Sequence, residues 1–226
     1  MIDYEAQRRA MVESQIRPNE VTDPSLLGAL RSVPRERFVP PALKSFAYMD
    51  EGIEVFPANE GAPARFLLAP MVQAKLIQLA EIEPQDKVLD VGCTTGYSTA
   101  VLADIAASVV GLEPEPELAK AARANLGALK LANAEIVSGD LRNGWAEQAP
   151  FDVIVLEGSV PEVPASLLSQ LKEGGRLVAV VTRGPNMRQG KAYLFTRVDG
   201  EASGVVHFDA GASPLPGLIP EPVFTF

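Results

Sequence analysis

The sequence predicts an α/β fold in which helices cover both faces of a mostly parallel sheet. An apolar strand at residues 87–91 runs into a turn bracketed by Gly92 and Gly96, and a helical pattern follows at once. Strand and helix patterns then alternate along the chain as far as an apolar strand at residues 176–181. An acidic residue, Glu113, ends the second of these strands, about 20 residues after the turn, which is typical of a nucleotide-binding βαβ unit.

The segment before this alternation is mainly helical. Proline and aspartate residues mark its boundaries, since Asp23-Pro24 can cap the start of a helix and Pro18 and Pro34 can end one. The predicted helices are residues 4–15, a segment from Pro24 to the residue before Pro34, and residues 70–79. Residues 46–65 have no regular pattern. We expect one domain over residues 1–226, with a helical extension at 1–80 and a cofactor-binding core at 81–226.

The core is predicted from apolar runs of strand length and from helical periodicity between them. The expected strands are residues 87–91, 108–112, 134–138, 151–156 and 176–181, the expected helices are 97–106, 115–129 and 164–171, and two late antiparallel strands are expected at 193–198 and 205–208. The end of the chain places Pro214, Pro216, Pro220 and Pro222 among apolar residues, and we expect it to pack irregularly on the surface.

Composition narrows the function classes. The chain has 226 residues, 47% of them hydrophobic, and a net charge of −9, and no basic stripe is visible, which disfavours a nucleic-acid substrate. One cysteine, Cys93, and one histidine, His207, exclude an internal disulfide and argue against a zinc site. Nothing at the start resembles a signal peptide, and no apolar run approaches the length of a membrane span, so we expect a cytoplasmic protein.

The glycine-rich turn and Glu113 indicate which cofactor to expect. A carboxylate at the tip of the second strand can accept both ribose hydroxyls of an adenosine, although a solvated acid in a loop is the alternative. The turn lacks the G-x-G-x-x-G pattern of dinucleotide binders and the lysine of a phosphate loop. An adenosine cofactor without phosphates therefore fits better, and S-adenosylmethionine is such a cofactor.

The carboxyl ends of the other strands supply further candidates, because ligands bind there in open α/β sheets. Asp90 could serve the ammonium group of the cofactor or be an acid flanking a turn, and Asp140 could accept from the adenine amino group. Gly158-Ser159 could line the space beside the sulfonium. Cys93 is read as a small turn residue, since no histidine lies nearby in sequence to activate it. The candidate cofactor-binding residues are Asp90, Gly92, Cys93, Thr94, Gly96, Glu113, Asp140, Leu141 and Glu157.

Seven stretches of the chain resemble the protein-L-isoaspartate O-methyltransferase family. They are residues 11–17 (MVESQIR), 33–40 (VPRERFVP), 47–50 (AYMD), 87–97 (KVLDVGCTTGY), 149–154 (APFDVI), 161–164 (PEVP) and 171–178 (LKEGGRLV). The resemblance implies a Rossmann-like, seven-stranded methyltransferase fold, with Glu113 on the ribose and Asp140 near the adenine. It also implies methyl transfer from S-adenosylmethionine to the carboxyl group of L-isoaspartyl residues, a protein-repair reaction on protein or peptide substrates.

The chain departs from the family's pattern before the core. Family members have a Gly-Gln-Thr-Ile-Ser-Gln-Pro stretch whose hydroxyl lies beside cofactor and substrate. Alignment on Pro70 places Leu68 at the serine and Phe66 at the threonine, so no catalytic residue is assigned here. Thr94 replaces the middle glycine of the turn, where it can narrow the cofactor site. Arg65 is a substitute candidate for holding a carboxylate, with a surface arginine as the alternative.

Three hypotheses follow from these residues. The first is a cytoplasmic S-adenosylmethionine-dependent carboxyl methyltransferase of the isoaspartate-repair type, with no nucleic-acid or membrane partner. The second is a catalytically impaired relative that binds the cofactor or a partner protein, which the replaced stretch around Leu68 favours. The third, a nicotinamide oxidoreductase, is weakened by the missing dinucleotide fingerprint.

Overall fold

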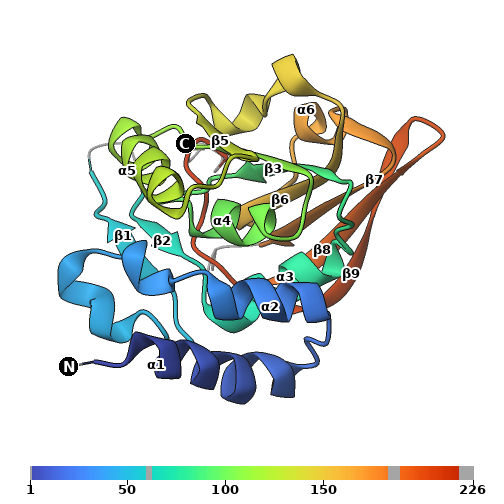
Figure 1. The fold of residues 1–226 in the computed structure, drawn as a ribbon. Helices are drawn as coiled ribbons and strands as arrows, with labels where there is room; N and C mark the ends of the chain where they lie inside the picture. The colour runs from blue at the N-terminus through green and yellow to red at the C-terminus, as the bar shows by residue number, and fades with distance from the viewer. Residues whose placement is uncertain (1, 60–62, 183–188, 219–226) are drawn as a thin grey trace, which may run out of the picture.

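Within the described residues, a seven-stranded sheet forms the centre of the fold (Figure 1). The computed structural model describes residues 2–59, 63–182 and 189–218. In spatial order the strands are β5 (Ala134–Val137), β4 (Ser108–Leu112), β3 (Lys87–Val91), β6 (Phe151–Val160), β7 (Leu171–Val181), β8 (Gln189–Val198) and β9 (Glu201–Gly211). The first five pair in parallel, and β8 and β9 are antiparallel, which confirms the predicted fold class.

The order of the strands fixes where a ligand can bind. From β3 the chain moves outward through β4 to β5, and it then returns to place β6 on the other side of β3. The direction of winding therefore changes between β3 and β6. In open α/β sheets a crevice forms outside the carboxyl ends of the strands at this point. The glycine-rich turn follows β3 directly, so it lies at that crevice.

Each face of the sheet packs against its own apolar layer, because the central strands are buried on both sides. One layer comes mainly from α3 (Pro70–Leu79), α4 (Tyr97–Ala103), α5 (Pro116–Leu129) and the N-terminal helices. The other layer comes from α6 (Ala165–Leu168) and from single residues of irregular segments, including Leu141, Leu215 and Leu218. The second layer is thinner, and part of it comes from the end of the chain.

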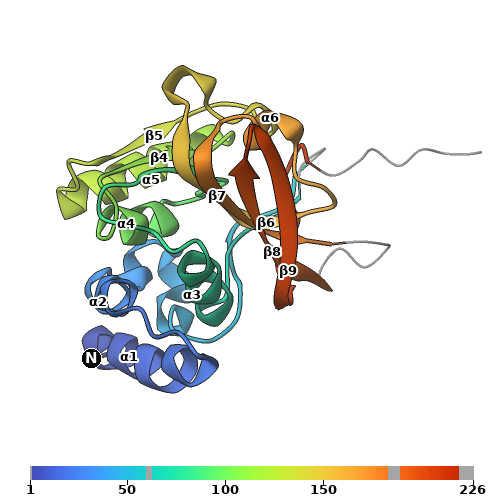
Figure 2. The same cartoon turned by 90° about the vertical axis from the view of Figure 1, so that its right-hand side faces the viewer.

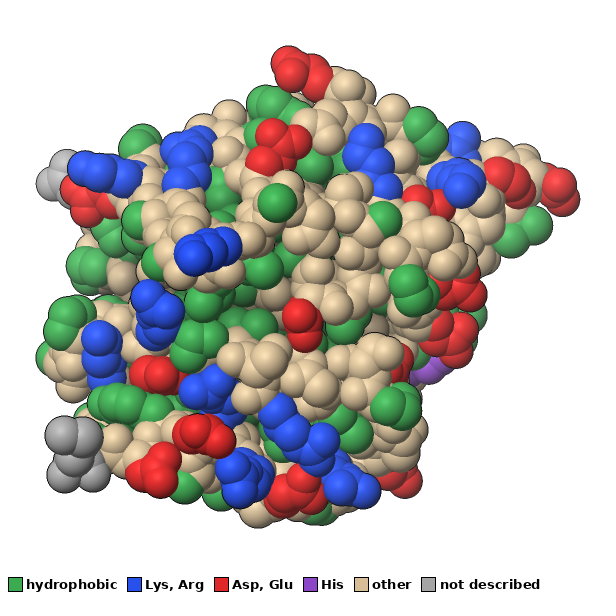
Figure 3. All heavy atoms as spheres, viewed as in Figure 1, with side chains coloured by type: hydrophobic (Ala, Val, Ile, Leu, Met, Phe, Trp, Pro, Cys, Tyr) green, Lys and Arg blue, Asp and Glu red, His purple; other side chains and the backbone are tan. Residues whose placement is uncertain are grey.

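The N-terminal segment forms an outer helical layer. Figure 2 shows α1 (Tyr4–Met11) as the outermost helix, with α2 (Pro24–Ser32) and α3 between it and the rest of the fold. Asp3 and Asp23 cap the first two helices by accepting backbone N–H bonds, as predicted for Asp23. In Figure 3 basic and acidic side chains alternate over this layer. Among the described residues, no helix is long and apolar enough to cross a membrane.

A second, two-stranded sheet was not predicted. Strand β1 (Ile53–Phe56), inside the stretch at 46–65 expected to be irregular, pairs antiparallel with β2 (Arg65–Leu67), which begins at the end of that stretch. Both strands are short and are separated by turn residues, so neither has a readable period of its own. Their pairing depends on a contact across the intervening loop, which a local pattern does not reveal.

Other differences concern boundaries and the end of the chain. Helices α4 and α6 end earlier than predicted, whereas β6, β7, β8 and β9 are longer. The expected surface location of the tail is wrong for its described part, because Leu215 and Leu218 are buried and Pro214 forms a bridge with Ser159 of β6. The predictions for Pro220 and Pro222 lie outside the described residues.

Candidate active site

The turn after β3 has the backbone geometry that its glycines allow. Gly92 has φ of +81° and Gly96 has φ of +88°, both in the left-handed region that favours glycine. A Cβ on Gly96 would lie 3.1 Å from the Cβ of Ala122, so α5 packs directly against the turn. Thr94 also has a positive φ, +51°, although it is β-branched, so the turn carries strain at this residue.

Asp90 lies at the end of β3 and is completely buried. Its Oδ2 accepts hydrogen bonds from Ser98 Oγ at 2.7 Å and from Thr99 Oγ1 at 2.6 Å, which ties the first turn of α4 to the strand. Its Oδ1 has no hydrogen-bond partner in the described part of the chain. Burial raises the pKa of Asp90 to about 7, against the lowering effect of the two hydroxyls. Asp90 is therefore a buried acid with one free oxygen.

Glu113 is also completely buried, so the solvated-acid alternative is wrong. Its carboxylate binds the guanidinium of Arg65 in a bidentate pair, with Nη1–Oε1 at 2.6 Å and Nη2–Oε2 at 2.9 Å. The backbone N–H groups of Thr94 and Glu115 donate to the same carboxylate, at 2.8 and 3.1 Å. The predicted ribose-binding carboxylate therefore already has four donors from its own chain.

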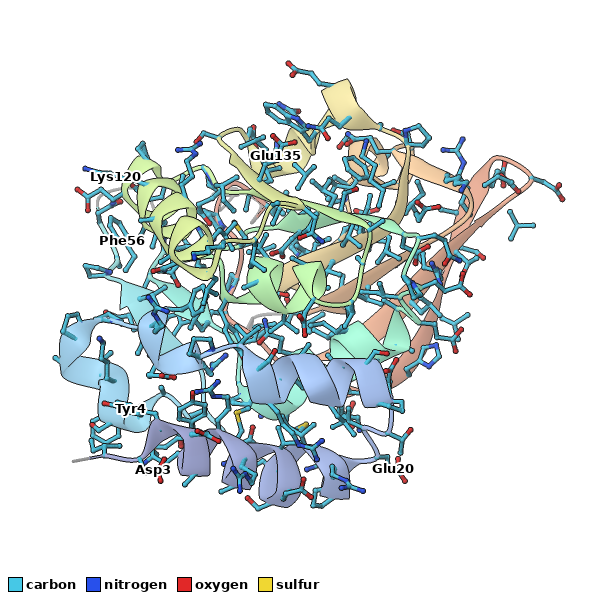
Figure 4. All side chains as sticks on the ribbon, viewed as in Figure 1. Asp3, Tyr4, Glu20, Phe56, Lys120 and Glu135 are labelled. Carbon is cyan, nitrogen blue, oxygen red and sulfur yellow. The ribbon has the colours of Figure 1, made fainter. Side chains whose placement is uncertain are left out.

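Arg65 is not the surface arginine given as the alternative, since only 5% of it is exposed. Besides Glu113 it donates to the carbonyl oxygen of Gly92 at 3.2 Å. A cavity of about 140 Å³ lies beside Arg65, lined by Phe56, Pro114, Glu115 and Pro216 among others. Figure 4 labels Phe56, one of the residues that line this cavity, at the edge of the molecule. Cofactor pockets are typically 300 Å³ or larger, so the cavity is too small for a whole nucleoside cofactor.

The described part of the tail covers the turn from the other side. A Cβ on Gly92 would lie 2.7 Å from Leu215 Cδ2, and one on Gly158 would lie 2.7 Å from Leu215 Cγ. Two backbone hydrogen bonds hold this segment against β6: Ser159 N donates to Ser213 O at 2.8 Å, and Leu215 N donates to Ser159 O at 3.0 Å. Leu215 therefore fills the space that two glycines leave open.

Glu157, toward the carboxyl end of β6, is the third buried acid of the site. Its Oε2 accepts from Gln73 Nε2 at 2.9 Å, and its Oε1 has no partner among the described residues. Burial raises the pKa of Glu157 well above its ordinary value, and the nearby charge of Asp90 acts in the same direction. Two buried carboxyl groups, each with one unpartnered oxygen, thus influence each other's protonation.

The remaining predicted residues lie around this group. Leu141 is buried, with its Cδ1 3.6 Å from the position of a Cβ on Gly92. Asp140 is exposed, accepts from Arg142 N at 2.9 Å, and lies 3.7 Å from the position of a Cβ on Gly217. Cys93 is fully buried and burial raises the pKa of its thiol well above the ordinary value, in agreement with its reading as a small turn residue.

Buried polar groups beneath the site were not predicted from the sequence. Arg35 is completely buried, donates to the carbonyl oxygens of Ala47 and Leu68 at 2.8 and 2.7 Å, and lies 4.7 Å from the ring centroid of Tyr97. It thereby fixes the backbone at Leu68, the position where the family pattern has a serine. The only signal for Arg35 was its place in one of the family-like stretches. A cavity of about 240 Å³ lies beside Leu68 and is lined by Phe66, Leu67, Ala212 and Ser213 among others.

Known proteins resemble this chain over most of its length. The family model "Protein-L-isoaspartate(D-aspartate) O-methyltransferase" matches residues 6–207. The chain belongs to the protein-L-isoaspartate O-methyltransferase family. A relative of that name from Methanoculleus marisnigri is 39% identical over 191 residues, which are 84% of this chain and 83% of the relative. One from Protochlamydia amoebophila is 38% identical over 191 residues, which are 84% of this chain and 87% of the relative.

Solved structures of family members have the same fold. A protein-L-isoaspartate O-methyltransferase matches 96% of this chain and 67% of its own with a TM-score of 0.79 and 25% identity. A second structure, from Plasmodium falciparum in complex with S-adenosyl-L-homocysteine, matches 94% of this chain and 98% of its own with a TM-score of 0.72 and 19% identity. Family membership thus confirms the resemblance drawn from the sequence.

Proposed function

We propose that this protein is an S-adenosylmethionine-dependent methyltransferase that methylates the carboxyl group of L-isoaspartyl residues in damaged proteins. Family membership over residues 6–207 supports the reaction class. The observation in the structure that carries the proposal is the position of Glu113, at the tip of β4 and hydrogen-bonded to the amide of the glycine-rich turn at Thr94. A carboxylate at this point of an open α/β sheet can hold the ribose of an adenosine.

The residues of the described conformation fit one end of the cofactor. The methionine part of S-adenosylmethionine carries an ammonium group, and Asp90 and Glu157 are buried acids that each keep one unpartnered oxygen. An ammonium placed between them would supply donors to both oxygens and relieve their mutual repulsion. These two residues, with the bare backbone of Gly92, are the ones we expect at that end.

The ribose end does not fit in this conformation. Arg65 occupies both oxygens of Glu113, and Leu215 lies against Gly92. The predicted assignments of Glu113 to the ribose and of Asp140 to the adenine stay predictions.

Methylation of a carboxylate requires little acid–base chemistry from the protein's side chains. A carboxyl group with an ordinary pKa near 4 is already ionised at neutral pH, so the reaction needs no general base. The rate can come from holding the acceptor in line and excluding water. The missing hydroxyl at Leu68 therefore removes a positioning group rather than a base. Leu68 lines the cavity of about 240 Å³, and we assign the peptide chain of the methyl acceptor to this cavity.

The proposal includes further points that rest on the sequence. Residues 1–226 form one methyltransferase domain in this proposal. The protein is cytoplasmic and acts on protein or peptide substrates, without a nucleic-acid partner. The alternative, which the residue at position 68 suggests, is a family member that has lost catalytic activity. An activity assay distinguishes this alternative from an active enzyme. Relatives over most of the chain are isoaspartate methyltransferases by name, which favours the enzyme.

Transfer of labelled methyl groups from S-adenosylmethionine to an isoaspartyl peptide tests the proposal. The matched control is the same peptide with a normal aspartyl residue, because it differs only in which carboxyl group is free. We expect base-labile label on the isoaspartyl peptide alone. Label on neither peptide, with folded protein and micromolar to millimolar cofactor, would contradict the proposed reaction.

A further inference from the structure

Glu113 has no acceptor capacity left for a ribose. A carboxylate offers two oxygens with about four lone-pair directions. Four donors already use them: the two terminal nitrogens of Arg65 and the backbone N–H groups of Thr94 and Glu115. The two backbone donors belong to the turn and to the start of α5, so they cannot leave without unfolding the site. Only Arg65 can give way to a vicinal diol.

Leu215 closes the same crevice from the tail. Its side chain approaches the backbone of both Gly92 and Gly158 so closely that a Cβ on either glycine would be 2.7 Å from it. Close backbone approach of this kind is what glycines at a ligand site allow. Here the approaching group belongs to the chain itself, so a side chain lies where a ligand would otherwise meet the turn.

The two closing groups meet at one residue. Arg65 donates to the carbonyl oxygen of Gly92, and the Cβ position of Gly92 is 3.4 Å from Arg65 Nη2 and 2.7 Å from Leu215 Cδ2. Pro216, the neighbour of Leu215, lines the same small cavity as Arg65. A ligand that contacts Gly92 and Glu113 therefore has to displace both groups.

The described part of the tail adds no strand to the sheet, so it can move without breaking the sheet's ladder of hydrogen bonds. Its contacts in the described part of the chain include the two backbone bonds to Ser159, a hydrogen bond from Arg142 to the carbonyl oxygen of Gly217, and the burial of Leu215 and Leu218. It forms an isolated bridge rather than a strand of the sheet. Segments outside the sheet can open locally at lower free energy than the core.

We propose that this chain closes its own cofactor cleft with Arg65 and Leu215, and that S-adenosylmethionine binds only after the tail at 213–218 and the Arg65 side chain have moved away. This inference rests on the proposed function, since it concerns the regulation of the same site. Binding to a protein whose open form is rare is weakened in proportion to the open fraction. Loosening either closing group therefore raises affinity for the cofactor without adding any contact to it.

Calorimetric titration with S-adenosylhomocysteine tests the proposal on the full-length wild type and on variants. L215A removes the tail's side chain, and R65Q removes the guanidinium while leaving Glu113 in place. The matched controls are L167A, an equally buried leucine of α6, and R176Q, whose ion pair with Asp86 lies at the opposite ends of the strands. We expect at least about tenfold tighter binding for L215A and for R65Q, and no tightening for either control.

Stopped-flow binding adds a second readout. If opening precedes binding, the observed rate should level off at high ligand concentration in the wild type and rise to a higher limit in L215A. Should R65Q fail to fold, L215A and a chain ending at residue 212 test the same point. If the wild type binds S-adenosylhomocysteine as tightly as every variant does, the cleft is not closed and the further inference is wrong, while the proposed function is unaffected. Absence of binding in the wild type and in all folded variants, at millimolar ligand, overturns the proposed function as well.

Discussion

The buried pair of Arg65 and Glu113 makes a quantitative prediction about stability. Arg65 is 5% exposed and Glu113 is fully buried, so neither charge is compensated by water when its partner is removed. Breaking a buried ion pair in this way costs about 3–5 kcal/mol. The two single variants should differ, because the residues keep different partners.

The hydrogen bonds show which variant loses more. In R65M, Glu113 keeps two backbone N–H donors, at 2.8 and 3.1 Å. In E113M, the acceptor that Arg65 keeps within the described part of the chain is the carbonyl oxygen of Gly92, at 3.2 Å. We therefore expect R65M to lose about 3 kcal/mol of unfolding free energy and E113M about 5 kcal/mol. The double variant R65M/E113M buries no unpaired charge, so its loss should be smaller than that of E113M alone and well below the sum of the two single losses.

Urea unfolding of the four proteins measures this double-mutant cycle. The slopes should agree, so that midpoint differences report stability. Losses that add to within about 0.5 kcal/mol would refute the coupling, since independent sites behave that way. A larger loss for R65M than for E113M would refute the assignment of the backbone donors to Glu113.

Three further predictions concern the turn and its surroundings. Burial raises the pKa of Asp90 to about 7, so between about pH 4 and pH 7 the folded chain holds a proton that the unfolded chain has lost, and stability falls as pH rises. The side chain of D90N cannot ionise, so the unfolding free energy of D90N, measured in urea, should rise relative to that of the wild type by about 1.4 kcal/mol per pH unit from pH 5 to pH 7. A difference in unfolding free energy that does not change with pH would contradict the raised pKa. G158A should cost about 1–3 kcal/mol of unfolding free energy through clashes with the Leu215 side chain and with the carbonyl oxygen of Ser213. The cost should shrink in an L215A background, which removes only the side-chain clash; an equal cost in both would contradict the contact between Leu215 and Gly158. The thiol of Cys93 is buried with a raised pKa, so a thiol reagent should label it only at the rate of unfolding, and rapid labelling of folded protein would contradict the packing of the turn.

The alternating core could be predicted because its signals are local. Strands such as residues 87–91 and 108–112 are apolar runs bounded by turns, and the helices between them have a clear period. The spacing of Glu113 from the turn likewise placed the acid at the correct strand tip. These features depend on neighbouring residues, so a single sequence contains them.

The contacts that close the site depend on distant residues. Arg65 follows a stretch without a period, and nothing near it in the sequence shows that its partner is Glu113, on another sheet. Leu215 lies among prolines, which favoured a surface tail, but pairing with β6 buries it. Arg35 similarly finds its acceptors at Ala47 and Leu68 only in the folded chain.

A crystal structure with S-adenosylhomocysteine tests the account most directly, because Glu113 can serve Arg65 or a ribose but not both. We expect both oxygens of Glu113 on the ribose hydroxyls, the guanidinium of Arg65 displaced, and Leu215 out of contact with Gly92 and Gly158. A bound ligand elsewhere on the protein, with the Arg65–Glu113 pair and the tail unchanged, would contradict it.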